Sequence, residues 1–205
     1  MGALMKVAGI HHAYGGRVVL RGVDVELPRG SLVGIVGENG AGKTTLLKIL
    51  AGELRPDRGV VRNEGRFGYC PQQVVLNDAF TVRQHLELFR TAYSLPDLRR
   101  AEEIMEALRF REYAQERVGA LSGGTRQKLN LTLALMHDPD VLLLDEPYQG
   151  FDWETYVRFW ELAVQLHTAG QSVLVVSHLA YDVDRLDVLW RLEKGVLCAG
   201  AGVVS

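Results

Sequence analysis

The sequence predicts an α/β domain built on a parallel sheet. Short, mainly apolar runs of strand length recur at Leu32–Val36, Val141–Leu144 and Ser172–Ser177. Such runs are typical of strands buried on both faces, as in parallel sheets that helices cover. Segments with helical spacing separate them, and strands that alternate with helices indicate a parallel arrangement. We expect a single domain over residues 1–205, because this length supplies one substantial core.

Two segments before the first buried run have a different pattern. Val18–Pro28 alternates valine and leucine with arginine, aspartate and glutamate, and Lys6–Ala13 lies just before it. Alternation with period two predicts strands that bury one face. We therefore expect an antiparallel β element near the N-terminus.

The segment Gly37–Thr44 fits G-x-x-x-x-G-K-[ST], and it lies between a predicted strand and the predicted helix Thr45–Leu50. In that context the loop amides and the helix dipole bind phosphate, the lysine reaches the β/γ-phosphates, and the threonine hydroxyl binds Mg²⁺. The alternative is a glycine-rich turn with a chance lysine, and both flanking elements argue against it. The expected phosphate-binding residues are Gly37, Asn39, Gly40, Ala41, Gly42, Lys43, Thr44 and Thr45.

The remaining elements are predicted from the spacing of apolar residues and from the positions of proline and glycine. Phe67–Cys70 is a short strand that Pro71 ends, and from Thr81 the apolar spacing becomes helical. A hairpin with its turn at Gly195 is expected from residues 188–192 and 196–198. We expect helices over residues 82–93, 98–108, 122–136 and 154–168, the first three of them in an inserted helical subdomain at about 79–137.

An acidic pair follows the second buried run. Asp145 falls at the C-terminal edge of its strand, where α/β sheets bind ligands, and it can hold Mg²⁺ opposite Thr44. Glu146 is placed to polarise an attacking water. A solvated acidic turn is the alternative. Ser122 is a natural helix N-cap, and the two glycines after it form a second candidate anion site, although alone they could be only a loop and a cap.

Together these motifs resemble those of ATP-binding cassette (ABC) ATPases, over nearly the whole chain. Gly37–Thr44 resembles the Walker A motif, Val141–Asp145 the Walker B motif, and Leu121–Thr125 the LSGGQ signature. The resemblance implies an α/β P-loop NTPase core with an N-terminal antiparallel β subdomain and an inserted helical subdomain. It implies Mg²⁺ and ATP as cofactors.

The resemblance also assigns single residues. Tyr14 corresponds to the aromatic ring that stacks on adenine, Gln72 to the Q-loop glutamine, and Asp152 to the D-loop aspartate. Either Gln72 or its neighbour Gln73 could be an ordinary loop residue, and the family pattern favours Gln72 as the Q-loop glutamine. His178 corresponds to the switch histidine that contacts the γ-phosphate. The implied catalytic residues are Glu146, His178 and Lys43; the metal site is Thr44, Gln72 and Asp145; further nucleotide contacts come from Tyr14, Gln72, Ser122, Gly123, Gly124 and Asp152.

Three departures from the family pattern bear on function. The signature ends in Thr125, and Tyr148 stands where a small threonine or serine is usual. The stretch 51–72 is short, as in ABC-F translation factors, but those proteins carry two cassettes and a different D-loop. We expect activity to survive the Thr125 change, and the Tyr148 change leaves the D-loop shape open.

The resemblance further implies a head-to-tail dimer, either a homodimer or a heterodimer with another ABC ATPase. We expect it to drive a separate transmembrane permease, most similar to small exporters, from a cytoplasmic, peripheral position on the inner face of the cell membrane. The alternative is a soluble ABC ATPase that acts on ribosomes or an assembly scaffold. A DNA-repair ATPase is disfavoured because a coiled coil and a basic patch are both lacking.

Composition narrows the partners. A formal net charge of −2 supplies no general basic field, so we expect no nucleic-acid partner. The sequence has no apolar run near the roughly 20 residues that a membrane span needs, so the spans would belong to another chain. Cys70 and Cys198 are too few for a zinc cage, and we expect both to be buried thiols.

Overall fold

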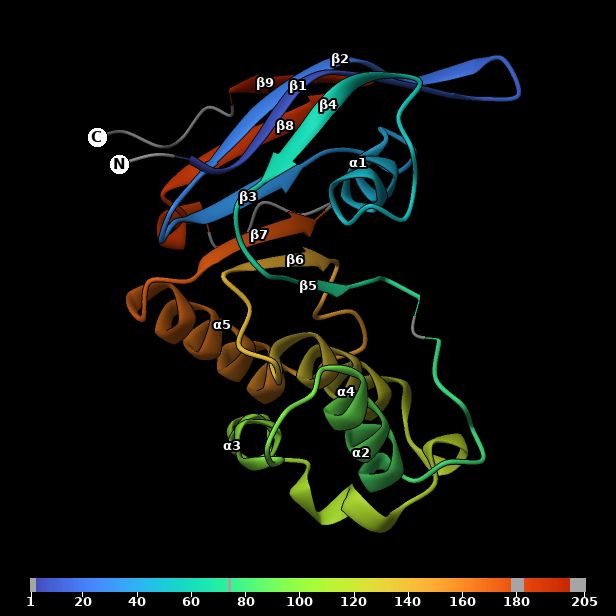
Figure 1. Cartoon of the computed structure of the whole chain (residues 1–205), viewed down its shortest axis with the longest axis vertical. Helices are drawn as coiled ribbons and strands as arrows, with labels where there is room; N and C mark the ends of the chain where they lie inside the picture. The colour runs from blue at the N-terminus through green and yellow to red at the C-terminus, as the bar shows by residue number, and fades with distance from the viewer. Residues whose placement is uncertain (1–2, 74, 178–182, 200–205) are drawn as a thin grey trace.

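A computed structural model describes residues 3–73, 75–177 and 183–199. The central sheet contains β3 (Leu32–Val36), β5 (Phe67–Cys70), β6 (Val141–Asp145), β7 (Ser172–Ser177), β8 (Val188–Glu193) and β9 (Val196–Ala199). Its strand order is β5-β6-β7-β3-β8-β9 (Figure 1). The neighbours are parallel except β8 and β9, which form the antiparallel hairpin expected at Gly195. Every residue of β3, β6 and β7 is buried, which confirms the parallel-sheet prediction.

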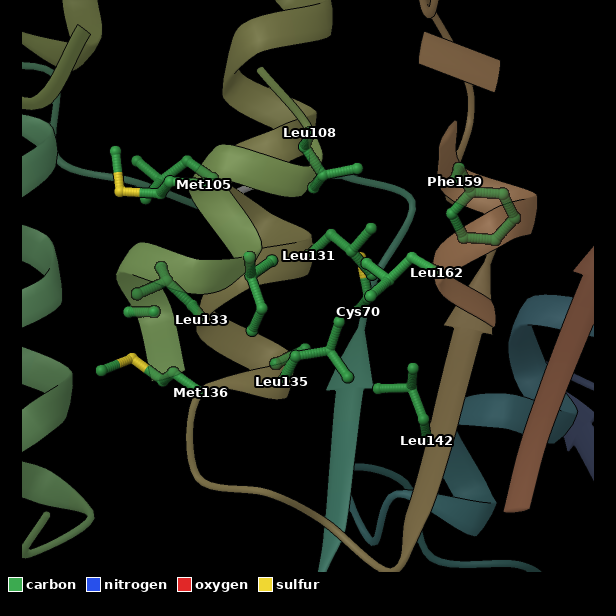
Figure 2. Close-up of a cluster of buried hydrophobic side chains, with 14 of the residues drawn as sticks. Cys70, Met105, Leu108, Leu131, Leu133, Leu135, Met136, Leu142, Phe159 and Leu162 are labelled. Atoms are coloured by element: carbon green, nitrogen blue, oxygen red, sulfur yellow. The ribbon is translucent and has the colours of Figure 1, made fainter. Parts of the chain in front are cut away.

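Two apolar clusters lie on opposite faces of this sheet. Along β6, Val141 and Leu143 join the cluster that includes α1 (Lys43–Leu50), whereas Leu142 and Leu144 join the cluster that includes α4 (Gly123–Leu135) and α5 (Trp153–Thr168). Figure 2 shows Leu142 facing the leucines of α4 and Leu162 of α5. The alternation follows from the period of a strand. It fixes the sheet as the middle layer of the molecule.

The N-terminal sheet covers the α1 side of the central sheet (Figure 1). Its strands are β1 (Ala3–Tyr14), β2 (Arg17–Pro28) and β4 (Arg58–Asn63), in the order β2-β1-β4, with both pairs antiparallel. The predicted pairing of the first two strands is confirmed. Strand β4 was not predicted, because five of its six residues are exposed and its sequence lacks the alternation that reveals a half-buried strand.

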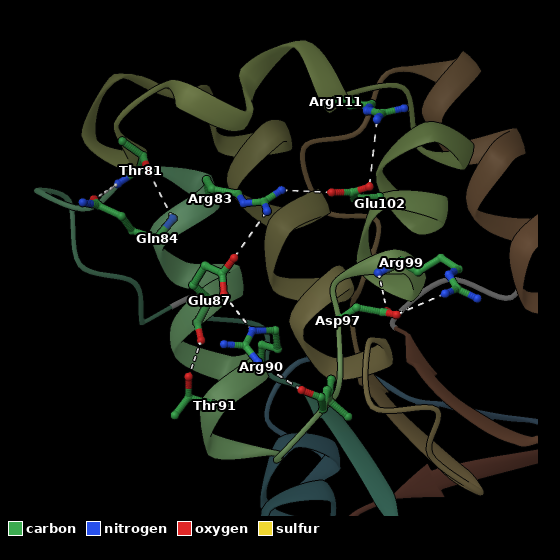
Figure 3. A network of polar contacts seen from close by, with 11 residues as sticks. Thr81, Arg83, Gln84, Glu87, Arg90, Thr91, Asp97, Arg99, Glu102 and Arg111 are labelled. Carbon is green, nitrogen blue, oxygen red and sulfur yellow. Dashed lines mark hydrogen bonds and ion pairs between the residues drawn. The ribbon is translucent and has the colours of Figure 1, made fainter.

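The helical region between β5 and β6 contains α2 (Val82–Ala92), α3 (Arg99–Ala107), two 3-10 turns, η1 (Arg111–Gln115) and η2 (Val118–Ala120), and then α4. Thr81 begins α2 with a capping box that Gln84 completes. Arg83 bridges Glu87 on its own helix and Glu102 on α3 (Figure 3). Exposed pairs of this kind contribute little, so the apolar cluster under α4 holds the helices in place.

The predicted helices all form, within a few residues of their expected ends. A last 3-10 turn, η3, spans Val183–Arg185. In the described part of the chain, no helix has both the length and the apolar character that crossing a membrane requires. The prediction for the cysteines is half right: Cys70 is buried, but Cys198 is exposed because it lies on β9, the edge strand of the sheet.

Candidate functional site

The phosphate loop connects β3 to α1 at the C-terminal edge of the central sheet. Gly42 is the N-cap of α1 and has φ 107°, a conformation that glycine adopts without a Cβ clash. No side chain caps this helix in the described structure, so the first N–H groups of α1 remain available to an anion. The loop therefore has the local geometry that the sequence predicts for phosphate binding.

Lys43 is buried, with 6% of its surface exposed. Its ammonium donates hydrogen bonds to the carbonyl oxygens of Gly37 (2.6 Å) and Glu38 (3.0 Å). Burial lowers its pKa, against the opposing charges of Glu146 and Asp145. The carbonyls of its own loop thus hold the ammonium close to the start of α1.

Asp145 ends β6 and is 1% exposed. Its Oδ2 is fully buried and finds no hydrogen-bond partner among the described residues. Burial raises the pKa of Asp145, and a hydrogen bond from the Thr44 hydroxyl opposes the shift. An unpaired buried carboxylate oxygen is costly unless a ligand uses it, and a carboxylate beside a hydroxyl is an oxygen donor set that fits Mg²⁺.

Glu146 lies next to Asp145 and is also buried, with 8% exposed. Its Oε2 accepts a hydrogen bond of 2.9 Å from the side-chain amide of Gln72. The contact forms because β5 and β6 are parallel neighbours, so the residues that follow them meet at one sheet edge. Gln73, the neighbouring alternative, is exposed.

Lys43, Thr44, Gln72 and Glu146 line one cleft of about 620 Å³, which we call the nucleotide cleft. Asp145 does not line it and lies beneath, bonded to the Thr44 hydroxyl. Tyr14 lies at its wall with 49% of its surface exposed, and the ring makes an edge contact with His12 at a centroid distance of 4.7 Å. Three lining residues were not predicted: Arg17, Val19 and Gln149. Arg17 had a weak signal, a cation near the predicted adenine ring. The predicted residues in the lining are Tyr14, Asn39, Gly40, Gly42, Lys43, Thr44, Thr45, Gln72 and Glu146.

Gly37 and Ala41, which the first cleft does not include, line a second cleft that adjoins it and shares Asn39 and Gly40 with it. This neighbouring cleft also has a volume of about 620 Å³, and the β8–β9 turn forms part of its wall. Of the predicted set, His178 lies outside the described residues.

The residues predicted from the signature and D-loop lie outside the nucleotide cleft: Ser122, Gly123, Gly124 and Asp152. Together with Gly150, which no site prediction named, they form what we call the signature surface. The Ser122 hydroxyl caps α4 by accepting from the Thr125 amide (3.2 Å), and Asp152 caps α5 by accepting from the Thr155 amide (2.8 Å). A Cβ at Gly124 would stand 2.6 Å from the Gly150 carbonyl oxygen, so the two loops touch through backbone.

Comparisons with known proteins decide the family. A family model described as ABC transporter matches residues 20–149. The chain is 34% identical to the Nod factor export ATP-binding protein I of Ralstonia nicotianae over 208 residues, which cover 94% of this chain and 65% of that protein. It is 39% identical to the zinc import ATP-binding protein ZnuC of Chromohalobacter salexigens, over 97% of this chain and 83% of that protein.

The chain belongs to the ABC transporter family. A solved ATP-binding subunit of an ABC transporter has the same fold, with a TM-score of 0.88 and 26% identity over 96% of this chain and 90% of that one. The resemblance inferred from the motifs is thereby confirmed, as is the α/β cassette fold. The chain spans 65% and 66% of the length of two relatives that are named Nod factor export ATP-binding protein I.

Two of the three departures from the family pattern, Thr125 and Tyr148, make defined contacts in the structure. In this ABC cassette, Thr125 still serves the signature helix, because its backbone amide bonds to Ser122 and its hydroxyl lies 3.0 Å from that of Ser122. Tyr148 is half-buried and packs on α5. Neither residue disturbs the close approach of Gly124 to Gly150.

Proposed function

We propose that this chain is the ATP-binding and ATP-hydrolysing subunit of an ABC transporter. Its family membership supports the class of activity. The observation that carries the proposal is that the phosphate loop and Glu146 line one cleft, while the buried Asp145 carboxyl is bonded to Thr44 of that lining. A volume of about 620 Å³ is within the usual range for small-molecule sites.

ATP would lie with its phosphates on the loop and its base toward Tyr14. The free amides at the start of α1 bind phosphate oxygens, and Lys43 turns its ammonium from the loop carbonyls to the β/γ-phosphates. Burial lowers the pKa of Lys43. An anionic phosphate beside the ammonium would oppose that shift, because a nearby opposite charge favours the charged form. Tyr14, half exposed at the cleft wall, offers a ring face on which adenine stacks.

The Thr44 hydroxyl and the orphan oxygen of Asp145 would hold Mg²⁺, with Gln72 as the third predicted ligand. When bound, this ion neutralises charge on the phosphate oxygens. The Glu146 carboxylate accepts a hydrogen bond from the attacking water and orients it. In the present structure that carboxylate accepts a hydrogen bond from the Gln72 amide, so the predicted glutamine and the predicted catalytic carboxylate are direct neighbours. Contact of His178 with the γ-phosphate stays a prediction.

The signature surface completes the site of a second cassette in this proposal. Ser122 and the adjacent Gly123 lie outside the nucleotide cleft of their own chain, and a Cβ built at Gly123 meets no described atom within 4 Å. An exposed helix start suits phosphate that a partner supplies. Two chains, identical or paralogous, would therefore close head to tail on two ATP molecules.

The proposed membrane partner is a transmembrane permease, and the proposed location is the cytoplasmic, inner face of the cell membrane. We favour export, which the name of the Nod factor relative supports, while the name of the ZnuC relative points to import. The alternative is a soluble ABC ATPase, an ABC-F-like ribosome factor or an assembly ATPase. No nucleic-acid partner is proposed.

Affinity capture tests the proposal. Tagged Glu146→Gln protein would be recovered from gently solubilised host membranes with ATP present, because slow turnover should hold it in the partner-bound state. The matched control is the same bait without ATP. Stoichiometric recovery of a multi-spanning membrane protein supports the transporter, and its cargo then decides between export and import. Recovery of ribosomes or a soluble scaffold without a membrane protein would overturn it.

A further inference from the structure

Tyr148 lies two residues after Glu146, in the turn that connects β6 to α5. Its ring makes edge contacts with Tyr156 and Phe159 of α5, at centroid distances of 5.2 and 5.6 Å. Its hydroxyl donates a hydrogen bond of 2.5 Å to Ser177 Oγ. Helix α5 thus fixes the ring, and the ring directs the hydroxyl to the end of β7.

The same turn contains an unusual backbone conformation at Glu146. Its φ of 47° is in the left-handed region, which residues other than glycine and asparagine seldom adopt and which must be held by surrounding contacts. The Glu146 amide donates to the Val176 carbonyl oxygen at 3.0 Å. Since Val176 and Ser177 are consecutive, the turn is attached to the end of β7 at two adjacent points, one through Glu146 and one through Tyr148.

Shorter side chains cannot make the second attachment from this position. A serine or threonine ends several ångströms before the point that the Tyr148 hydroxyl reaches, and it offers no ring for α5 to hold. The aromatic residue at 148 therefore adds a contact that the small residue usual in the family would lack. The contact acts on the segment that carries Glu146, whose carboxylate must keep its place beside Gln72 and the phosphate loop.

We propose that Tyr148 is a positioning residue, which holds the Glu146 turn against β7 through Ser177 and so sets where the Glu146 carboxylate lies. This inference rests on the proposed role of Glu146 in orienting water. It extends that role, because it names a side chain that touches neither nucleotide nor water but acts through Glu146.

The test is a double-mutant cycle with Tyr148→Phe and Ser177→Ala. Tyr148→Phe removes one hydroxyl and keeps the ring on α5. Each single change should lower kcat about two- to tenfold, the range expected for one hydrogen bond, with KM for ATP unchanged within about twofold. The loss in the double variant should be smaller than the product of the two single losses, because both single changes remove the same contact. Tyr113→Phe, in η1 and 39% exposed, is the matched control and should leave kcat unchanged.

Hydrogen exchange separates this inference from the proposed function. The amides of Glu146, Gln149 and Phe151 are bonded within the turn or to β7, and they should exchange faster in Tyr148→Phe and in Ser177→Ala. Unchanged exchange in both variants, or independent additive losses of kcat, would overturn the positioning role. If the wild-type chain hydrolyses no ATP, the proposed function fails, and the exchange measurement still decides whether Tyr148 holds the turn.

Discussion

The nucleotide cleft lies beside a buried carboxyl group that the described residues do not fully satisfy, whereas the predicted polar residues of the signature surface cap helices of their own chain. Asp145 keeps a buried carboxylate oxygen without a partner in the described structure. Ser122 and Asp152, by contrast, both accept backbone N–H groups. Beside the nucleotide cleft, a buried carboxylate oxygen therefore has hydrogen-bonding or metal-binding capacity that a small ligand could use. On the signature surface, the capping side chains are already satisfied by amides of their own chain. Any binding role of that surface therefore requires another molecule.

The largest effect should come from Glu146→Gln, a change inside the cleft. The amide keeps the shape of the side chain and cannot act as the carboxylate that orients water, so turnover should fall about 10²- to 10⁴-fold. ATP affinity should stay within about threefold, since Glu146 is no phosphate ligand in the proposed site. Steady-state phosphate release and equilibrium ATP binding measure the two quantities.

A matched exposed carboxylate serves as the control. Glu103 pairs with Arg100 on the surface of α3, and Glu103→Gln should leave both turnover and affinity unchanged. A near-normal rate in Glu146→Gln would remove Glu146 from catalysis. The nucleotide cleft would then differ from the signature surface only in ligand binding, and not in a catalytic carboxylate.

A mixing experiment tests whether the two regions serve each other across a dimer. Lys43→Ala breaks the cleft, and Ser122→Arg blocks the signature surface, so each variant alone should be inactive. In a head-to-tail dimer, one chain of each kind leaves one site with an intact Lys43 and an intact Ser122. An equal mixture should therefore recover about a quarter of wild-type turnover.

The outcome depends on the dimer geometry. A mixture that stays as inactive as its components would show that the signature surface does not complete a partner's site. Activity of Ser122→Arg alone would show the same. Mixing Lys43→Ala with a second cleft variant, Glu146→Gln, is the control that should recover nothing.

The sequence predicted the cleft best where its residues are consecutive. The loop from Gly37 to Thr44 is a local pattern between two local elements, and its geometry follows directly. The Gln72–Glu146 contact joins residues 74 positions apart, and it depends on β5 pairing with β6. Sheet order is a tertiary property, so the sequence placed both residues near a nucleotide through family resemblance and gave no hint that they bond to each other.

Missed features share a physical cause. Arg17 and Gln149 enter the cleft from a hairpin and a turn, where no periodic signal marks the direction of a side chain. Strand β4 was missed because its exposed residues carry no alternation. The consequence of Tyr148 was also hidden, since its partners on α5 and β7 come from other segments.

On the signature surface, a pair of neighbouring glycines gives a smaller, structural prediction. A Cβ at Gly124 would meet the Gly150 carbonyl oxygen at 2.6 Å, whereas one at Gly123 meets no described atom within 4 Å. Gly124→Ala should therefore force the two loops apart and destabilise the fold by about 1–3 kcal/mol. Gly123→Ala should be neutral or slightly stabilising, because alanine favours the helix. Thermal unfolding of both variants compares them, and equal shifts in Tm would contradict the close approach.

The smallest expected effect concerns the charge of the Asp152 cap. The hydrogen bonds from Thr155 lower the pKa of Asp152. A carboxyl whose pKa is lower in the folded state stabilises the fold above its unfolded pKa, and it loses that contribution as pH falls through the folded pKa. Asp152→Asn keeps a cap acceptor and removes the charge, so its Tm should lie below the wild-type Tm at neutral pH. The difference should close as pH falls below about 4, the ordinary value for aspartate. A Tm difference that is constant with pH would mean that the charge of Asp152 does not serve α5. In that case the charge of Asp152 would have a role only toward a partner that binds the signature surface.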